Sequence, residues 1–475
     1  MMRMRYKKAG FIAVLYLLKI QVVFGISDRS LNDVVGGPLS YDRIVDRLIK
    51  ENLYFTAIPF MKEILSGRQQ IRNSNRFEGN IEKLIAEVGV RQFETLPDSI
   101  LSRVGAPIIY YIRAKKYFRR GQYRKALQAL RSNFGDSSIG PFVSMLRGSI
   151  YSITGQSKKA IWAFEECSEG SLGFMTEKGI RWKQYQITKD YCLIGKARAL
   201  FELRRYEEAS STYLDLDKSS PVWPEILFEE AWTSFYQKNY NRTLGKIVSY
   251  KAPVFQNFFI PEFSILEALS YMELCLWSDA KKSIDAFYKE YIRSARQLGR
   301  FLKQKGNDYR YFYKAARARK KRRVPGGMLY NRLLRSVIFS PGYQELNQTL
   351  LRGNRELSLI RGSRSAKAKR ILLPGLKDTL NLQKRLLGSY VRKELLVKYS
   401  LLRKAFTQMS YIKLEILKRK KSDLYYQIKN KTRERGDIRY LRRNEKQYFW
   451  DFNGEFWADE LGDYVFALPS KCVVK

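Results

Sequence analysis

The residue types that carry out acid–base and metal chemistry are unevenly represented in this 475-residue chain, which contains no histidine. Histidine is the usual general base near neutral pH and the commonest ligand of zinc. A Ser-His-Asp triad, a Cys-His pair and a histidine-based zinc site are therefore excluded. Any catalysis has to use carboxylate, lysine, tyrosine or thiol groups. We expect a protein that is not an enzyme and that binds no metal and no cofactor.

Carboxylates gather near the C-terminus, where five acids alternate with aromatic residues. These acids are Asp451, Glu455, Asp459, Glu460 and Asp463. Their spacing differs from that of a known calcium loop. The pair Asn453-Gly454 between aromatic runs predicts a tight hairpin turn. We predict a small cap whose acids complement the basic helices on which it docks. A cation site or a catalytic carboxylate pair is the alternative.

Four cysteines are scattered through the chain, at positions 167, 192, 275 and 472. None belongs to a CxxC motif, which excludes a zinc ribbon or a thioredoxin-type motif. Cys167 and Cys192 fall on adjoining repeats, so one interpretation is a disulfide between them. The other is that the thiols are free and buried.

The charge of the chain is strongly basic and unevenly placed. The net charge is +42, and residues 301–450 contribute 40 Lys and Arg against 10 Asp and Glu. The candidates for contact with an anionic surface form one run: Arg317, Arg319, Lys320, Lys321, Arg322 and Arg323. Such a run fits an anionic membrane surface or an acidic protein, nucleic-acid phosphates, or a solvated helix end. Nucleic acid is the less favoured partner.

The first 25 residues have the pattern of a secretory signal peptide. Basic residues at positions 3–8 precede an apolar run, Ala9–Leu18, and cleavage is predicted after Gly25. The apolar run is too short to span a bilayer stably. No cysteine lies near the cleavage site, so a lipoprotein is not indicated. We expect a periplasmic, exported protein; an uncleaved anchor or a cytoplasmic apolar N-terminus are the alternatives.

The elements that position these residues repeat along the chain. Small residues, tyrosines and glycines recur at a spacing of 34 in Tyr110–Leu130 and Ser144–Phe164, and again around Ala197 and Ala231. This period is typical of helical hairpins that bury their apolar faces by stacking on neighbours. Glycine at 121 and 155 suits the left-handed residue that ends a first helix. Arg204 occupies that position in the third unit.

Five such units lie between residues 108 and 291, and the third ends at Pro221. At these positions the chain resembles a tetratricopeptide repeat (TPR) protein. The resemblance implies a concave face lined by the first helix of each hairpin, suited to binding a protein segment. The positions that map to this face are Tyr111, Lys115, Phe118, Met145, Arg198, Phe201, Phe228, Trp232, Phe235, Tyr236 and Met272. The alternative is that neighbouring helices or the C-terminal region cover this face.

The organisation of the whole chain follows from these patterns. We predict an all-α fold: a TPR-type solenoid, then a basic long-helix or coiled-coil-like region and a small C-terminal hairpin cap. An apolar stripe from Leu387 to Ile416 favours a long helix or a coiled-coil hairpin, with an interruption expected at Gly388. The predicted boundaries are 1–25 (signal peptide), 26–105 (N-terminal hairpins), 106–291 (solenoid), 292–330 (basic helix and linker), 331–447 (basic region) and 448–475 (cap).

The C-terminal residues carry a second, shorter resemblance. Its positions are Trp450, Phe452, Gly454, Glu455, Trp457, Asp459, Glu460, Gly462 and Tyr464. They resemble the C-terminal motif of exported bacterial TPR proteins linked to gliding motility and cell-envelope machinery. We therefore expect a non-catalytic protein–protein scaffold of the bacterial cell envelope, in a motility or envelope-spanning assembly. The alternative is a cytoplasmic, nucleic-acid-associated TPR protein that uses residues 301–450.

Overall fold

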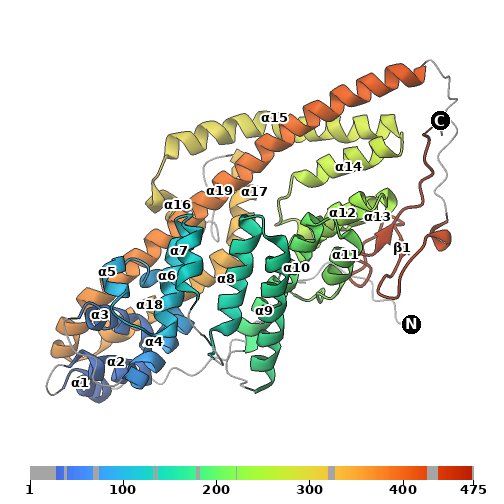
Figure 1. Ribbon diagram of the computed structural model, residues 1–475. Coiled ribbons are helices and arrows are strands. Elements are labelled where there is room, and N and C mark those ends of the chain that lie inside the picture. Colours follow the sequence, from blue (N-terminus) through green and yellow to red (C-terminus); the bar gives the residue numbers. More distant parts are fainter. Residues whose placement is uncertain are drawn as a thin grey trace, which may run out of the picture. The chain divides into compact units, whose positions relative to one another are not determined.

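The protein is helical throughout the part of the chain that its computed structural model describes (Figure 1). The described residues are 28–36, 40–67, 74–131, 134, 137–177, 182–220, 222–318, 327–424 and 437–472. They form nineteen α-helices, three short 3-10 helices and two strands of two residues each. The predicted all-α fold is confirmed. The predicted signal peptide, residues 1–25, lies outside the described residues.

The chain folds into two compact units. The first, unit 1, combines the described residues up to Gly89 with Leu351–Leu380; the second, unit 2, contains Val90–Leu350 and Asn381–Lys475. Within the described residues, no helix is both long enough and apolar enough to cross a membrane.

Unit 1 is built from four helices and parts of two longer ones. The four are α1 (Asp28–Val35), α2 (Tyr41–Lys50), α3 (Tyr54–Leu65) and α4 (Ser74–Val88). Parts of α18 (Pro341–Gly362) and α19 (Ala366–Leu424) complete it. Helix α18 fits closely because Gly353 has no side chain: an added Cβ would lie 2.7 Å from Leu380 and 2.9 Å from the Phe55 ring.

A buried carboxylate from α18 caps the start of α3 in unit 1. Glu356 accepts hydrogen bonds from the backbone N–H of Phe55 (3.0 Å) and of Thr56 (2.8 Å), and from the Thr56 hydroxyl (2.8 Å). These N–H groups belong to the first turn of the helix, where no carbonyl of the same helix can satisfy them. Burial raises the pKa of Glu356 to about 7, although the hydrogen bonds oppose the shift.

Unit 2 begins with a 3-10 helix (Val90–Gln92) and the short α5 (Asp98–Leu101), followed by five consecutive helical hairpins. Their helices are α6 (Pro107–Arg119) with α7 (Tyr123–Ala129), α8 (Gly140–Ile153) with α9 (Ser157–Glu177), α10 (Trp182–Glu202) with α11 (Tyr206–Leu214), α12 (Trp223–Tyr236) with α13 (Tyr240–Tyr250), and α14 (Glu262–Glu273) with α15 (Trp277–Lys305). A 3-10 helix (Pro253–Phe255) lies between the last two hairpins. Each hairpin packs on the next along the chain (Figure 1).

The same turn closes all five hairpins. One residue of each turn is left-handed, with φ between 55° and 73°: Gly121, Gly155, Arg204, Lys238 and Cys275. The N–H of the following residue donates to the carbonyl five positions earlier, at 2.8–3.0 Å. This pair of features is the Schellman termination of a helix. The glycine turns at 121 and 155 are confirmed, and Arg204, Lys238 and Cys275 adopt the same geometry despite their side chains.

The small residues of the 34-residue period are the points where helices approach most closely. Ala114, Ala160 and Ala197 are fully buried. An added Cβ on Gly148 would lie 2.7 Å from the Phe164 ring, and one on Gly195 would lie 2.5 Å from it. One phenylalanine thus fills the space left by two glycines on α8 and α10.

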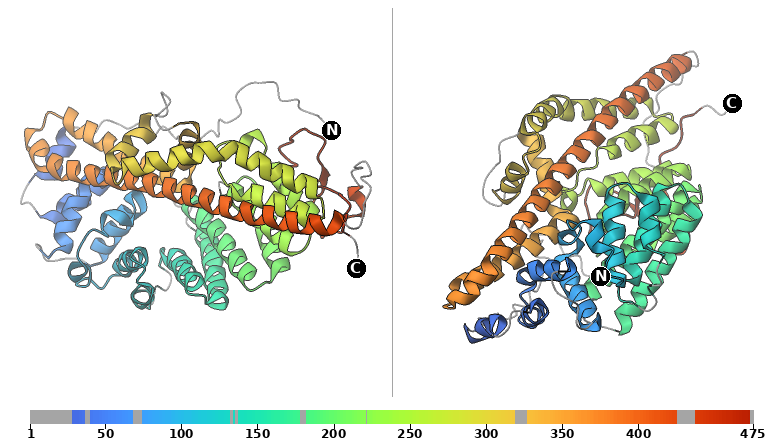
Figure 2. Two further views of the ribbon diagram at one scale, coloured as in Figure 1. Left: turned by 90° about the horizontal axis from the view of Figure 1, so that it is seen from above. Right: turned by 60° about the vertical axis from the view of Figure 1, so that its left-hand side comes forward.

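The remainder of unit 2 contains α16 (Tyr309–Ala318), α17 (Gly327–Phe339) and the rest of α18 and α19. Within this unit α19 runs beside α15, as Figure 2 shows. The Phe406 ring lies 5.0 Å from that of Phe287 and 5.7 Å from that of Tyr288. The long basic helix therefore packs along the last helix of the hairpin array.

The predicted apolar stripe of α19 is buried, but the predicted interruption is wrong. Leu387, Val391 and Leu395 are fully buried, and α19 continues through Gly388 without a break. At Gly388 an added Cβ would collide with the carbonyl group of Tyr309. The glycine therefore lets the start of α16 approach α19 closely.

The end of the chain holds a 3-10 helix (Ile438–Tyr440) and two short strands, β1 (Trp450–Asp451) and β2 (Tyr464–Val465). The strands pair in parallel, with Trp450 opposite Tyr464. The predicted hairpin at Asn453-Gly454 is therefore wrong, because a tight turn joins only antiparallel strands. A longer loop connects the strands, and it turns at Gly454 and Gly462, which have φ of +99° and +91°.

Candidate functional site

Five of the predicted groove residues meet in one cluster of aromatic rings on α10 and α12. We call Phe201, Phe228, Trp232, Phe235 and Tyr236 the aromatic cluster. Ring centroids are 5.3 Å apart for Phe201 and Tyr236, 5.9 Å for Trp232 and Tyr236, 5.7 Å for Trp232 and Phe235, and 6.3 Å for Phe228 and Trp232. The spacing of three, four and eight along α12 places its four rings on one side of the helix.

The aromatic cluster is open to solvent at its Tyr236 end. Tyr236 is 49% exposed, whereas the other four rings are partly buried against the core of the hairpins. Tyr206 stacks on Tyr236 with centroids 5.4 Å apart. Exposed rings held rigidly by neighbouring rings are the side chains that most often anchor a protein partner.

An ion pair lies beside the cluster. Arg198 of α10 donates from its Nε atom to Glu229 of α12 at 2.9 Å, and the Tyr213 hydroxyl donates to the same carboxylate at 2.8 Å. Burial raises the pKa of Tyr213, and the Glu229 charge adds to the shift. The Arg198 side chain is about half exposed. This predicted site residue therefore places a charge close to the aromatic rings.

At the other end of α12, carboxylates face the long helix α19. Burial raises the pKa of Glu225 on α12 and of Glu262 on α14. Burial lowers the pKa of Lys398 on α19, while Glu394, Glu225 and Glu262 oppose the shift. Helix α19 thus approaches α12 near Glu225, at the start of that helix. Tyr236 lies at its other end.

The remaining predicted groove residues do not join the aromatic cluster. Tyr111 and Met272 are buried, and Phe118 packs on Tyr123 of its own hairpin with centroids 5.9 Å apart. Met145 packs against the buried residues around Cys167. Lys115 lies 5.8 Å from the centre of the Tyr111 ring, and burial lowers its pKa to about 8.

The basic run lies mostly outside the described residues. Arg317, at the end of α16, is exposed and donates to the Tyr313 hydroxyl at 2.7 Å. The other five candidates, Arg319, Lys320, Lys321, Arg322 and Arg323, are not among the residues that the structure describes.

The C-terminal cap, residues 446–472, docks on the fourth hairpin through its backbone. At Gly245 on α13 an added Cβ would collide with the carbonyl oxygen of Tyr464. Asn241 accepts a hydrogen bond from the N–H of Leu468 (3.0 Å) and donates one to the carbonyl of the same residue (3.1 Å). Sequence analysis did not single out Gly245 or Asn241; a glycine inside a predicted helix was the available signal for the first.

A buried ion pair lies beneath the cap. The Lys246 amine donates to Glu230 of α12 (2.9 Å) and to the carbonyl of Gly462 in the cap (3.1 Å). Only 1% of Lys246 is exposed. Burial lowers the pKa of Lys246, and the Glu230 charge opposes the shift. The lysine therefore links the hairpin and the cap.

The residues of the C-terminal motif divide between the inside and the surface of the cap: Gly462 and Tyr464 are buried, whereas Trp450, Gly454, Glu455 and Asp459 are exposed. Tyr464 is fully buried; its hydroxyl accepts from the Trp457 N–H (2.9 Å) and donates to the Glu455 carbonyl (3.3 Å). Burial raises the pKa of Tyr464 to about 12. The Phe452 ring lies 5.2 Å from that of Tyr464, and Gly462 leaves room for the Trp223 ring. Trp450 is more exposed.

The predicted docking partner of the cap is wrong. Asp463 pairs with Lys218 before α12 (2.7 Å), and Lys446 of the cap pairs with Asp215 after α11 (2.6 Å). Within the described residues, these contacts place the cap on the hairpin array and not on the basic helices between residues 309 and 424. Backbone hydrogen bonds and the close approach at Gly245 set the position of the cap. A prediction from charge alone cannot detect these contacts. Among the described residues, no group of three or more acids and cysteines is placed to hold a metal ion.

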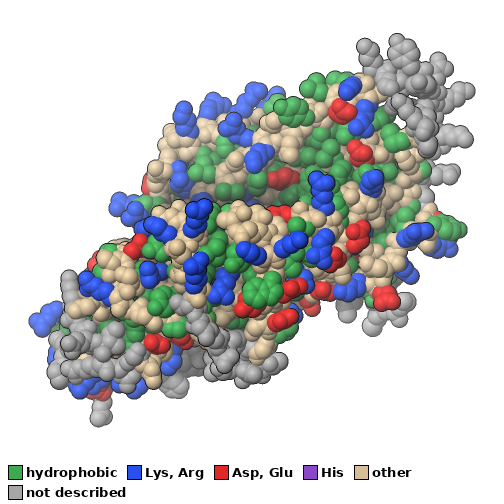
Figure 3. Space-filling view, in the orientation of Figure 1, with side chains coloured by type: hydrophobic (Ala, Val, Ile, Leu, Met, Phe, Trp, Pro, Cys, Tyr) green, Lys and Arg blue, Asp and Glu red, His purple; other side chains and the backbone are tan. Residues whose placement is uncertain are grey.

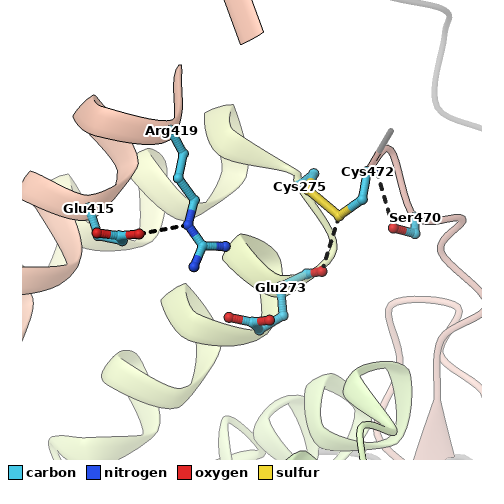
Figure 4. The surroundings of a disulfide bond; sticks show 6 residues. All are labelled: Glu273, Cys275, Glu415, Arg419, Ser470 and Cys472. Atoms are coloured by element: carbon cyan, nitrogen blue, oxygen red, sulfur yellow. Dashed lines mark hydrogen bonds and ion pairs between the residues drawn. A yellow bond between two sulfur atoms is a disulfide. The ribbon is translucent and has the colours of Figure 1, made fainter. Parts of the chain in front are cut away.

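Two disulfides join elements of unit 2. Cys167 and Cys192 link α9 to α10, so the disulfide interpretation holds for this pair. Cys275, in the turn between α14 and α15, pairs with Cys472 at the end of the cap (Figure 4). The Lys471 N–H donates to the Leu274 carbonyl beside it (3.0 Å). The second pair was not predicted, because 197 residues separate its cysteines.

Neither a protein-family model nor a curated protein matches the sequence.

Proposed function

We propose that this protein is a non-catalytic scaffold that binds a protein partner through the aromatic cluster. The observation that carries the proposal is the set of rings on the first helices α10 and α12, exposed at Tyr236 and flanked by the exposed Arg198. Aromatic and arginine side chains are enriched among the residues that dominate binding at protein interfaces. Rings that are already packed lose little conformational freedom when they bind.

We further propose that the hairpin array belongs to the TPR class. Support comes from the 34-residue spacing, the shared turn geometry at five positions and the close helix contacts at small residues. In that class the first helices of the hairpins form the binding face, which is where the aromatic cluster lies.

We place the scaffold in the bacterial cell envelope, exported to the periplasm, in a motility or envelope-spanning assembly. The signal-peptide pattern supports export, and the two disulfides agree with it because disulfides persist mainly in oxidising compartments. The motility assignment rests on the C-terminal motif alone. The cytoplasmic, nucleic-acid-associated alternative has less support, because disulfides are rare in the reducing cytoplasm.

A photo-crosslinking amino acid at Tyr236, in cells that make the protein naturally, tests the binding proposal. We expect a discrete protein to be captured at Tyr236 and not at Trp162, an exposed residue of α9 outside the aromatic cluster. The captured partner should bind the purified Tyr236→Ala variant at least about tenfold more weakly than it binds the parent protein. Capture of nucleic acid instead, or an unchanged affinity, overturns the proposal.

A fusion of residues 1–30 to a reporter that is active only after export tests the location separately. Activity is expected, and an inactive reporter with a stable fusion supports the cytoplasmic alternative.

A further inference from the structure

The last turns of α19 carry an exposed apolar stripe that the proposed function does not use. Tyr411, Leu414 and Leu417 are 69%, 63% and 57% exposed. Each follows the previous one by three residues, so they lie on one side of the helix. The opposite side carries Met409, Ile412 and Ile416, which are buried. The helix is therefore apolar on two sides, and only one of them is covered by described residues.

Basic side chains surround this stripe. Arg403, Lys404, Lys413 and Lys418 are exposed, and none of them forms an ion pair with a described residue. The acid nearest the stripe, Glu415, is already paired with Arg419 (2.7 Å). Figure 3 shows Lys and Arg side chains interleaved with apolar ones over this end of α19 and along α15. The surface thus combines apolar side chains with an unpaired positive charge.

We propose that this face of α19 binds an anionic lipid surface, with Tyr411, Leu414 and Leu417 entering the boundary between headgroups and acyl chains. Helices that lie in the membrane interface have this composition: leucine and aromatic residues on one stripe, with lysine and arginine beside it. Tyrosine favours this depth because its ring is apolar and its hydroxyl is polar. Nearby lysines and arginines are attracted to anionic headgroups.

Two other occupants fit the observations less well. A second copy of the chain would bring the same cations and a net charge of +42 against this face, so repulsion opposes self-association. A protein partner needs a contact area of about 800 Å² on each side. The stripe is three side chains on one convex helix, whereas a lipid surface needs no complementary shape. This inference does not rest on the proposed binding of a protein at the aromatic cluster.

Vesicle binding by the purified, disulfide-bonded protein tests the proposal. The protein should co-sediment with phosphatidylglycerol vesicles and not with phosphatidylcholine vesicles. The variant Tyr411→Ser/Leu414→Ser/Leu417→Ser keeps every charge, and we expect it to bind at least about tenfold more weakly because the apolar area that enters the lipid is lost. The matched control is Ile153→Ser/Trp162→Ser/Val254→Ser, which removes three exposed apolar side chains elsewhere in unit 2 and should bind as the parent does.

A spectroscopic measurement does not depend on losing binding. Tyr411→Trp should add tryptophan emission that shifts to shorter wavelength with phosphatidylglycerol vesicles, whereas addition of phosphatidylcholine vesicles should leave it unchanged. Failure of the parent protein to bind phosphatidylglycerol overturns the proposal. So does equal binding of the triple variant, which would assign the attraction to net charge alone. A dimer that the triple variant abolishes, without vesicle binding, would assign the stripe to a second copy.

Discussion

The two helices of the fourth hairpin, α12 and α13, present surfaces of opposite character. The surface of α12 that carries Trp232 and Tyr236 is built of rings and is partly open to solvent. The surface of α13 is covered by the C-terminal cap, which it holds through Asn241, Gly245 and Lys246. The covered surface matches the backbone of one segment by hydrogen bonds and by shape. The open surface presents apolar ring area and few hydrogen-bonding groups. It therefore suits a partner that is recognised by its side chains and not by its backbone.

If this contrast is correct, changes on the covered surface lower stability, and changes on the open surface lower binding. The largest effect is expected at Lys246. Lys246→Met leaves Glu230 buried without its cation, and we expect a loss of about 4 kcal/mol in the free energy of unfolding. Urea denaturation of the purified protein measures this loss.

The double variant Lys246→Met/Glu230→Leu is the control for Lys246→Met. It removes both charges, so it should recover most of the stability. Lys251→Met provides a second comparison, because its ion pair with Glu267 is half-exposed on the lysine side and should contribute less than about 1 kcal/mol. Equal losses at Lys246 and Lys251 would contradict the importance of the buried pair.

Glu356 in unit 1 extends the comparison to a buried carboxylate that is held by backbone N–H groups. Its pKa is about 7 in the folded protein, against 4.5 for an unperturbed glutamate, so the folded state retains a proton that the unfolded state has lost between these values. The contribution of Glu356 to the free energy of unfolding should therefore be largest below pH 4.5 and be lost as the pH rises through about 7. The difference corresponds to about 3 kcal/mol.

Urea denaturation at several pH values tests the assignment to Glu356. In Glu356→Gln this part of the pH dependence should disappear, because glutamine does not titrate. The variant Glu63→Gln, which removes an acid elsewhere in unit 1, should retain it. A parent protein that becomes more stable between pH 4.5 and 7, relative to Glu356→Gln, would show that the hydrogen bonds outweigh burial.

Gly245→Ala changes only the fit of the cap. The new methyl group collides with the Tyr464 carbonyl, so we expect the cap to shift and the protein to lose about 2 kcal/mol. Limited proteolysis should then cleave residues 446–472 faster. The matched control is Gly173→Ala in α9, where an added Cβ meets nothing within 4 Å. That change should leave cap protection unaltered and stabilise the helix slightly.

The smallest effect on stability is expected at the open surface. Tyr236→Ala removes a ring that is half exposed, so the free energy of unfolding should change by less than about 1 kcal/mol. Partner affinity should fall at the same time. A large loss of stability in Tyr236→Ala, without a loss of affinity, would show that the aromatic cluster is part of the core and not a binding surface.

The features that sequence analysis predicted correctly are those with a local period. The turn at Gly121 recurs 34 residues later at Gly155, and the same spacing joins Arg204 to Lys238. The buried side of α19 also follows from spacing, because residues three or four apart lie on one face of a helix. Five groove candidates came together because four lie on one side of α12, and Phe201 occupies on α10 the position equivalent to Phe235.

The incorrect predictions concern contacts between segments that are distant in the sequence. Gly388 looked like a break, but its role is set by Tyr309 on another helix. The cap was assigned to the basic helices from charge, whereas it recognises α13 through the backbone of Tyr464 and Leu468. A glycine can mark a turn or a close approach, and sequence alone does not distinguish them without knowledge of the opposing segment.

The cap also sets an order of events during synthesis. Each hairpin can stack on its predecessor soon after it is made. The hydrogen bond from Lys246 to the Gly462 carbonyl can form only after more than 200 further residues have been synthesised. Until then α13 exposes a surface whose polar groups are arranged for a segment that does not yet exist. Cys275 waits for Cys472 over a similar length of chain. Until Cys472 is made, Cys275 is a free thiol that could exchange with the disulfide between Cys167 and Cys192. The bond between Cys275 and Cys472 can form only after the cap has docked, so its presence reports that folding is complete.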